Sequence, residues 1–230
     1  MALTTSWLIA YYKGDESSGN ATDSVWGFTL TANNGATFAT WKLNNGMSLD
    51  GTNDYFSTSS DLWLNGTSQN YSFTMWIKPT ATITTQQVFI NHNQAEFDLY
   101  EYVEWFSGNL RHVRVRQWAA ADVLSVAQTF TAWTWYFLAG TYDGSTMTIS
   151  VNAGSRTTRS STGNGTSGWV DWFTLGSQIG WWWAYFNWII DEVAVYNRAL
   201  TTGEESDNYG GGTPPPYGWA TIFIPKIIIC

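Results

Sequence analysis

Three carboxylates, Glu96, Asp98 and Glu101, lie within the six-residue stretch EFDLYE. Two carboxyl groups about 5–5.5 Å apart can cleave a glycosidic bond with retention, one as the nucleophile and the other as the acid/base. In a regular strand Glu96 and Asp98 share a face, whereas Glu101 points to the other face because its offset is odd. The three groups could therefore act together only if a β-bulge restored their facing.

The same stretch also opens a hairpin in which opposite charges would face each other. The sequence from Glu96 onward predicts two strands that turn near residues 107–108. If Trp105 lies opposite Leu110 across this turn, Glu101 lies opposite Arg114. In the same register Glu104 lies opposite Arg111. Opposite charges across neighbouring strands stabilise a sheet mildly, and we favour this structural role over catalysis.

A second candidate site is aromatic and lies in residues 180–188, GWWWAYFNW. Its rings are Trp181, Trp182, Trp183, Tyr185, Phe186 and Trp188. Consecutive residues of a strand alternate between faces, so these rings cannot all enter one core. Exposed aromatic rings stack on the C–H faces of sugars and anchor protein interfaces. We expect this segment to contact a protein neighbour or a glycan, with core filling as the remaining role.

The charge and composition of the chain exclude several partners. The net charge is −8, with 10 Lys and Arg residues against 18 Asp and Glu residues, which argues against nucleic acid and against an anionic membrane surface. The single cysteine, Cys230, can form neither an intrachain disulfide nor a cysteine-based zinc site. We expect no signal peptide and no membrane span, because the first residues lack a basic region and no apolar run is long enough.

Short β-branched and aromatic runs alternate with Gly, Asn, Asp and Ser along the chain, which predicts an all-β fold. Residues 71–79 alternate and predict a half-buried strand ended by its proline. Residues 135–154 predict a hairpin that turns at residues 142–145. Residues 189–200 predict a last long strand, and residues 201–209 a short helical turn. Together these elements indicate a jelly-roll-like antiparallel β-sandwich in which strands distant in the chain pair.

The end of the chain differs in composition from the rest. We expect one domain over residues 1–212, followed by a Pro-rich linker and an apolar extension over residues 213–230. The apolar residues of the extension are Trp219, Ile222, Phe223, Ile224, Ile227, Ile228 and Ile229. A free segment of this kind is prone to aggregate. We therefore expect it either to pack on its own domain or to add a strand to a neighbour as an assembly element.

Several stretches, in chain order, resemble the laminin-G-like jelly-roll domains of the concanavalin A-like superfamily. They are residues 8–34, 47–57, 71–79, 135–154 and 189–212. An ordered series of this kind is more specific than any single motif. The resemblance implies a concanavalin A-like, all-β antiparallel jelly-roll β-sandwich. Such modules are usually non-catalytic and occur in adhesins, carbohydrate-binding appendages, calcium lectins and phage structural proteins.

Without an expected export signal or disulfide, the domain is most similar to the phage members of the family. Virion proteins assemble in the host cytoplasm, where they need no export signal and where disulfides are rare. The resemblance thus implies a virion surface component, a capsid decoration or fibre, within a homo-oligomer or virion shell. The alternative is a stand-alone, extracellular or cell-surface lectin that binds a glycan. A third possibility is a retaining β-glucanase similar to laminarinases. In that case Glu96 would be the nucleophile, Glu101 the acid/base, and Asp98 the group that tunes the nucleophile.

The calcium-binding relatives imply a possible cofactor. The resemblance maps their two calcium loops to residues 93–95 and 177–179. Gln178 is retained, but Ser177 and Ile179 stand where acidic ligands would be, and a hard cation prefers charged oxygens. Three further carboxylates could ligate calcium, although we expect them to form turns by accepting bonds from nearby backbone N–H groups. They are Asp50, Asp54 and Asp191.

Overall fold

A computed structural model of the chain describes residues 3–41, 44–60, 62, 64, 70–94, 99–116, 122–161, 172–177 and 184–210. Their elements are β1 (Leu8–Tyr12), β2 (Thr31–Asn33), β3 (Thr37–Trp41), β4 (Asn44–Ser48), β5 (Tyr55–Thr58), β6 (Tyr71–Pro79), β7 (Gln87–Gln94), β8 (Leu99–Phe106), β9 (Asn109–Arg116), β10 (Asp122–Ala127), β11 (Tyr136–Tyr142), β12 (Thr146–Val151), β13 (Thr157–Ser160), β14 (Trp172–Leu175), β15 (Trp188–Tyr196) and α1 (Thr202–Tyr209).

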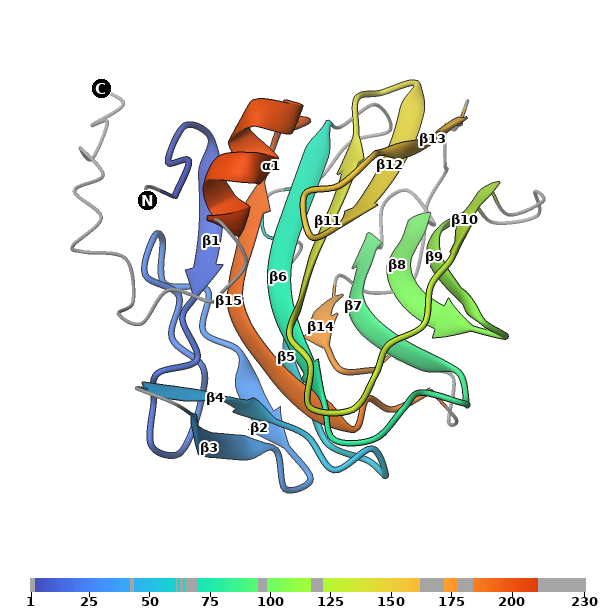
Figure 1. The fold of residues 1–230 in the computed structure, drawn as a ribbon. Coiled ribbons are helices and arrows are strands. Elements are labelled where there is room, and N and C mark those ends of the chain that lie inside the picture. Colours follow the sequence, from blue (N-terminus) through green and yellow to red (C-terminus); the bar gives the residue numbers. More distant parts are fainter. Residues whose placement is uncertain are drawn as a thin grey trace, which may run out of the picture.

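The strands form two antiparallel sheets that face each other (Figure 1). The eight-stranded sheet has the order β13-β12-β11-β6-β15-β4-β3, and β1 also pairs with β15. The seven-stranded sheet has the order β10-β9-β8-β7-β14-β5-β2. In both sheets a late strand lies between early ones, since β15 pairs with β6 and β4 and β14 pairs with β7 and β5. The predicted antiparallel jelly-roll sandwich is therefore confirmed.

One end of the sandwich, which we call the loop end, is the lower end in Figure 1. Here β6 ends beside the start of β15, and β7 starts beside the end of β8, as the pairs Pro79–Trp188 and Gln87–Trp105 show. The connections at this end include residues 49–54, 80–86, 107–108, 128–135, 176–177 and 184–187. Segments far apart in the sequence thus meet at one end of the molecule.

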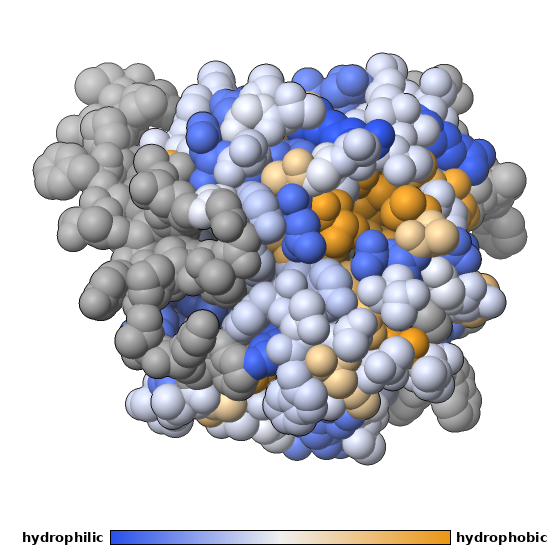
Figure 2. All heavy atoms as spheres, viewed as in Figure 1, coloured by the Kyte–Doolittle hydropathy of each residue, from blue (hydrophilic) through white to orange (hydrophobic). Residues whose placement is uncertain are grey.

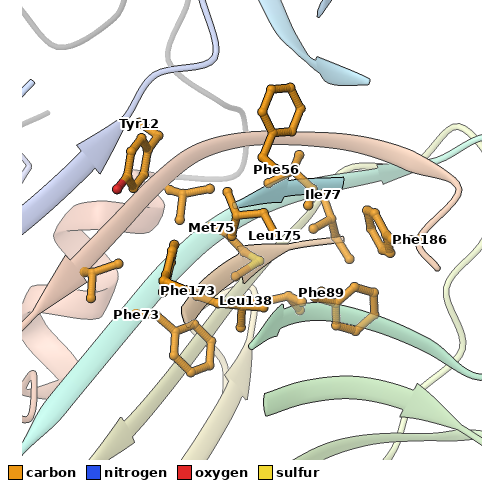
Figure 3. Close-up of a cluster of buried hydrophobic side chains, with 14 of the residues drawn as sticks. Tyr12, Phe56, Phe73, Met75, Ile77, Phe89, Leu138, Phe173, Leu175 and Phe186 are labelled. Carbon is orange, nitrogen blue, oxygen red and sulfur yellow. The ribbon is translucent and has the colours of Figure 1, made fainter. Parts of the chain in front are cut away.

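The core lies between the two sheets and is rich in aromatic residues. Figure 3 shows Met75 and Ile77 from β6 pointing toward side chains of the opposite sheet, among them Phe89 from β7 and Leu175 from β14. Each fully buried side chain of this kind contributes about 1.5–3 kcal/mol relative to its exposed state. The alternating pattern of the strands is what sends these residues to one face.

The strand β6 is buried on both faces, so the predicted half-buried strand is wrong in this respect. Its outward residue Trp76 stacks on Tyr209 from α1, with 5.5 Å between ring centroids, and also contacts Phe137 from β11 at 5.4 Å. The helix covers this part of the sheet and removes it from solvent. Figure 2 shows hydrophilic residues over α1 and a band of hydrophobic residues to its right.

The predicted helical turn is confirmed as α1. It begins with a capping box, in which the Thr201 hydroxyl accepts from the Glu204 N–H and the Glu204 carboxylate accepts from the Thr201 N–H. Arg198 and these bonds lower the pKa of the Glu204 carboxyl to about 2. Gly210 ends the helix in the left-handed conformation that glycine favours. In the described part of the chain no helix is long and apolar enough to cross a membrane.

Candidate binding surface at the loop end

The segment 128–135 crosses the loop end from the seven-stranded sheet to the eight-stranded sheet, and hydrogen bonds fix it at both sides. The Gln128 N–H donates to the Gly108 carbonyl oxygen at 3.1 Å, and the Trp133 N–H donates to the Pro79 carbonyl oxygen at 2.7 Å. Between these points, Phe130 is fully buried. The segment is therefore held at both ends and in the middle, and it presents its other side chains in a fixed arrangement.

Trp133 is the exposed large hydrophobic residue of this segment. Its exposed fraction is 63%, although an indole of this size is usually buried for the most part. Its φ is +64°, in the left-handed region, which costs about 1–2 kcal/mol for a residue with a Cβ. Strain of this kind persists only where the surroundings impose it, and it concentrates at functional sites. The backbone bond to Pro79 imposes it here.

Two further aromatic rings continue from Trp133 over the outer face of the eight-stranded sheet. The Lys78 ammonium lies 5.8 Å from the ring centroids of both Trp133 and Trp135, within the range of a cation–π contact. The Trp135 ring meets Trp76 edge to face at 6.3 Å. The Lys78 side chain is buried and therefore has a fixed position, and its contact with both rings holds the two indoles in place. The result is a row of rings whose outer member is open to solvent.

A second exposed ring at the loop end is Phe106, the last residue of β8, with an exposed fraction of 42%. The Arg111 guanidinium lies 4.9 Å from this ring centroid and 3.1 Å from a Glu104 carboxylate oxygen. Glu104 is buried and also accepts a hydrogen bond from Gln86 at 2.6 Å. Burial raises the pKa of the Glu104 carboxyl above its ordinary value, although the Gln86 bond and the Arg111 charge oppose this.

The predicted hairpin is confirmed, with a turn at residues 107–108. The backbone register places Glu101 opposite Arg114 and Glu104 opposite Arg111, as the sequence predicts. Glu96 and Asp98 lie outside the described residues, between β7 and β8, whose ends pair as Gln94 with Leu99. Of the three carboxylates of EFDLYE, only Glu101 belongs to a described strand.

The structure corrects part of the aromatic interface predicted in residues 180–188. Phe186 is fully buried and Trp188 is 2% exposed, so neither ring is open to a surface partner. Both pack in the core against Phe89, at ring-centroid distances of 4.9 Å and 6.3 Å. Tyr185 is half-buried. Trp181, Trp182 and Trp183 lie outside the described residues, as does the predicted assembly tail from Trp219 to Ile229.

Of the two segments that the resemblance suggested for calcium, the structure describes residues 93–94 and Ser177, and these described residues lie apart along β7. The Gly176 N–H donates to the Phe89 carbonyl oxygen, which places Ser177 at the loop end. Asn93 lies four residues further along β7, about 13 Å away toward the other end of the sandwich. Among the described residues, no group of three or more His, Cys, Asp or Glu side chains could hold a metal ion. Gln178 and Ile179 lie outside these residues.

The turn-forming role predicted for the isolated carboxylates is visible at the loop between β4 and β5. Asp50 accepts from the backbone N–H groups of Thr52, at 2.7 Å, and Asn53, at 3.3 Å. Asp54 accepts from the Asp50 N–H at 3.2 Å. Asp191 accepts from the N–H of the next residue, within the irregular part of β15, and burial raises the pKa of its carboxyl well above the ordinary value.

No motif in the sequence singles out Trp133 or Trp135. Their spacing in TAWTWYF directly before a strand was the only local signal, and it is equally consistent with two core residues. Exposure of Trp133 follows from the bond between its backbone and Pro79, a residue more than fifty positions earlier in the chain. A contact of this separation leaves no local pattern.

Comparisons with solved structures show what the fold is similar to. Domain 4 of AbnA, a GH43 extracellular arabinanase from Geobacillus stearothermophilus, solved with arabinotriose, aligns with a TM-score of 0.70 and 21% identity, over 88% of this chain and 98% of that domain. The binding domain of botulinum neurotoxin serotype G aligns with a TM-score of 0.67 and 14% identity, over 88% of this chain and 50% of the toxin domain.

A further toxin binding domain, botulinum neurotoxin DC in complex with SialylT, aligns with a TM-score of 0.66 and 9% identity, over 88% of this chain and 51% of that one. The chain thus spans about half the length of the toxin binding domains. At these identities the likeness shows the fold alone. No curated protein matches the sequence. Residues 50–204 match the family model Laminin_G_3, and the chain belongs to this family of the concanavalin A-like lectin/glucanases superfamily.

Proposed function

We propose that the protein is a non-catalytic binding module that takes carbohydrate at its loop end, with Trp133 as the main contact. The observation that carries this proposal is the Trp133 indole, which is exposed and yet fixed by its backbone and by Lys78. A ring that is already ordered loses little conformational entropy when it binds. Its apolar face suits the C–H face of a sugar ring, and no charge on the ligand is required.

The similar structures support the choice of ligand class. The arabinanase domain, which this chain covers almost completely, was solved with arabinotriose, and one of the toxin domains was solved with SialylT. These ligands belong to those proteins. They motivate oligosaccharides as the first ligands to examine here, both a neutral arabino-oligosaccharide and a sialylated glycan.

Replacing Trp133 by alanine is expected to weaken oligosaccharide binding on the order of tenfold or more, because truncation of an anchoring aromatic ring removes the largest apolar contact. Binding can be measured by a glycan array and then by titration calorimetry with the glycan that binds. Trp7→Ala is a matched control, since Trp7 has nearly the same exposed fraction (64% against 63%) and the same φ of 64°.

Equal glycan affinity of the wild type and the Trp133→Ala variant would contradict binding at the loop end. Loss of binding in Trp7→Ala alone would place the binding site near Trp7 instead. A wild-type protein that binds no glycan on the array would contradict the ligand class itself. Release of sugar products from a β-glucan, ended by Glu96→Gln, would contradict the non-catalytic part of the proposal.

A more specific proposal concerns where the module acts. The chain contains no cysteine pair and carries an apolar extension after residue 212, and these sequence features support a virion surface component, as a capsid decoration or fibre, that displays the loop end. Such a component is expected to form a defined oligomer of the full chain in solution, which light scattering measures. A monomer at all accessible concentrations would instead favour the stand-alone lectin.

A further inference from the structure

Arg111, on β9, is a fixed cation at the loop end that the Trp133 contact does not use. Its guanidinium lies 4.9 Å from the centroid of the Phe106 ring, and its Nη1 atom lies 3.1 Å from a carboxylate oxygen of Glu104. The Glu104 side chain is 1% exposed, and its other oxygen accepts a hydrogen bond from Gln86 at 2.6 Å. A buried carboxylate at one edge and an aromatic ring at one face therefore hold the guanidinium in one orientation.

The ion pair leaves most donors of this guanidinium unused. The group carries five N–H donors on three nitrogen atoms, and Glu104 faces only Nη1. Among the described residues no acceptor bonds to Nε or Nη2, and neither atom is a buried donor without a partner. Because the side chain is 22% exposed, these donors reach solvent. The two nitrogen atoms lie on one edge of the planar group, where their N–H groups form a fork.

A fork of this kind selects the shape of its partner. Two parallel N–H donors match the two oxygens of a carboxylate, and such charge-assisted bonds are roughly twice as strong as neutral ones. Contacts with Glu104 and Phe106 already order the Arg111 side chain, so little conformational entropy is lost when an anion binds. The edge of Arg111 that carries Nε and Nη2 is thus suited to a planar anion with two oxygens.

The Phe106 ring and the net charge of the chain narrow the class of ligand. Phe106 is 42% exposed although Arg111 lies over the ring, so an apolar group beside the carboxylate can contact it. The C–H face of a sugar ring suits this contact. The net charge of −8 repels acidic proteins and nucleic acids over their whole surface, whereas a small anion with one charge is repelled far less. A sugar that carries a carboxylate meets both conditions.

We propose that Arg111 and Phe106 form a second binding site at the loop end, which takes the carboxylate of an acidic sugar, either a uronic acid or a sialic acid. The carboxylate pairs with Nε and Nη2 of Arg111, and the sugar ring lies against the exposed part of Phe106. Glu104 and Gln86 position Arg111 without touching the ligand. The site is independent of the Trp133 contact, because Phe106 ends a strand of the seven-stranded sheet whereas Trp133 bonds to Pro79 of the eight-stranded sheet.

NMR titration of the full chain tests this site. Methyl glucuronide and N-acetylneuraminic acid are the acidic probes, and methyl glucoside is the neutral counterpart of the first. We expect an acidic probe to shift the Arg111 Nε–H signal and the neutral probe to leave it unchanged. The affinity for the better acid should exceed that for methyl glucoside on the order of tenfold, since hydrogen bonds to charged groups are worth about 1.5–3 kcal/mol. The better acid also identifies the kind of sugar.

The variant Arg111→Lys separates the fork from the charge. Lysine keeps a cation beside Glu104, so the buried carboxylate stays paired, but it offers no planar fork, and we expect the affinity for the acid to fall on the order of tenfold. Arg159→Lys is the matched control, because Arg159 also pairs with a carboxylate, that of Asp122 at 3.5 Å, and lies on another strand. It should bind the acid as the wild type does, and circular dichroism checks that both variants are folded.

Three results would overturn the proposal. The first is an Arg111 Nε–H signal that neither acid shifts. The second is an equal affinity for methyl glucuronide, N-acetylneuraminic acid and methyl glucoside, and the third is an unchanged affinity for the acid in Arg111→Lys. A short peptide containing glutamate that shifts the same signal as strongly as the sugar acids would overturn the ligand class in favour of acidic peptides.

Discussion

Replacing Phe130 by alanine is expected to lower the free energy of unfolding by about 3–5 kcal/mol, the usual cost of emptying a buried phenylalanine site. Phe130 is fully buried and contacts Tyr136 at a ring-centroid distance of 4.8 Å, Phe89 at 5.8 Å and Trp188 at 6.1 Å. These rings come from both sheets and from three separate strands, so little can collapse into the space that the substitution leaves.

The same substitution should also affect the loop end, because Phe130 is the buried anchor of the segment that carries Trp133. Urea unfolding followed by circular dichroism measures the change in stability, and calorimetry under folding conditions measures the loss of glycan affinity. Thr129→Ala is the control, since Thr129 is exposed and a surface change of this kind stays within about 0.5 kcal/mol. A loss of stability below about 1 kcal/mol for Phe130→Ala would show that the aromatic cluster relaxes freely.

The second large effect is expected at the ion pair between Arg111 and Glu104. The Glu104 side chain is 1% exposed, and Arg111→Ala leaves this carboxylate buried without its cation. Removal of one partner from a buried pair costs about 3–5 kcal/mol, because the remaining charge stays desolvated. The double variant Arg111→Ala/Glu104→Gln keeps the polar group beside Gln86 and removes the charge, so we expect it to be more stable than Arg111→Ala alone.

The pH dependence of this effect has a definite sign. Burial already raises the folded-state pKa of Glu104, and loss of Arg111 raises it further. Between the unfolded and the folded pKa the folded state binds the proton more readily, so stability increases as the pH falls. The deficit of Arg111→Ala should therefore shrink on acidification, which urea unfolding at several pH values measures. A deficit independent of pH would show that lost packing on Phe106, rather than the buried charge, is its cause.

The sequence alone determined the elements whose signals are local. The strand-like runs joined by a turn at residues 142–145 predicted the β11–β12 hairpin, and the turn near residues 107–108 predicted the register that pairs Glu104 with Arg111. Thr201 and Glu204 are spaced as a capping box, and α1 begins there. In each case a period of two residues, or a spacing of three, specifies the conformation with neighbouring residues only.

Tertiary structure alone decided which of these residues meet solvent and which meet each other. The pattern of β6 marks one buried face, but its second face is buried because Tyr209, far along the chain, stacks on Trp76. Trp188 belongs to a run that was expected to form an interface and lies in the core, whereas Trp133, which no sequence pattern singled out, stands exposed. Burial depends on contacts between distant segments, and no periodicity within a segment records which distant segment will cover it.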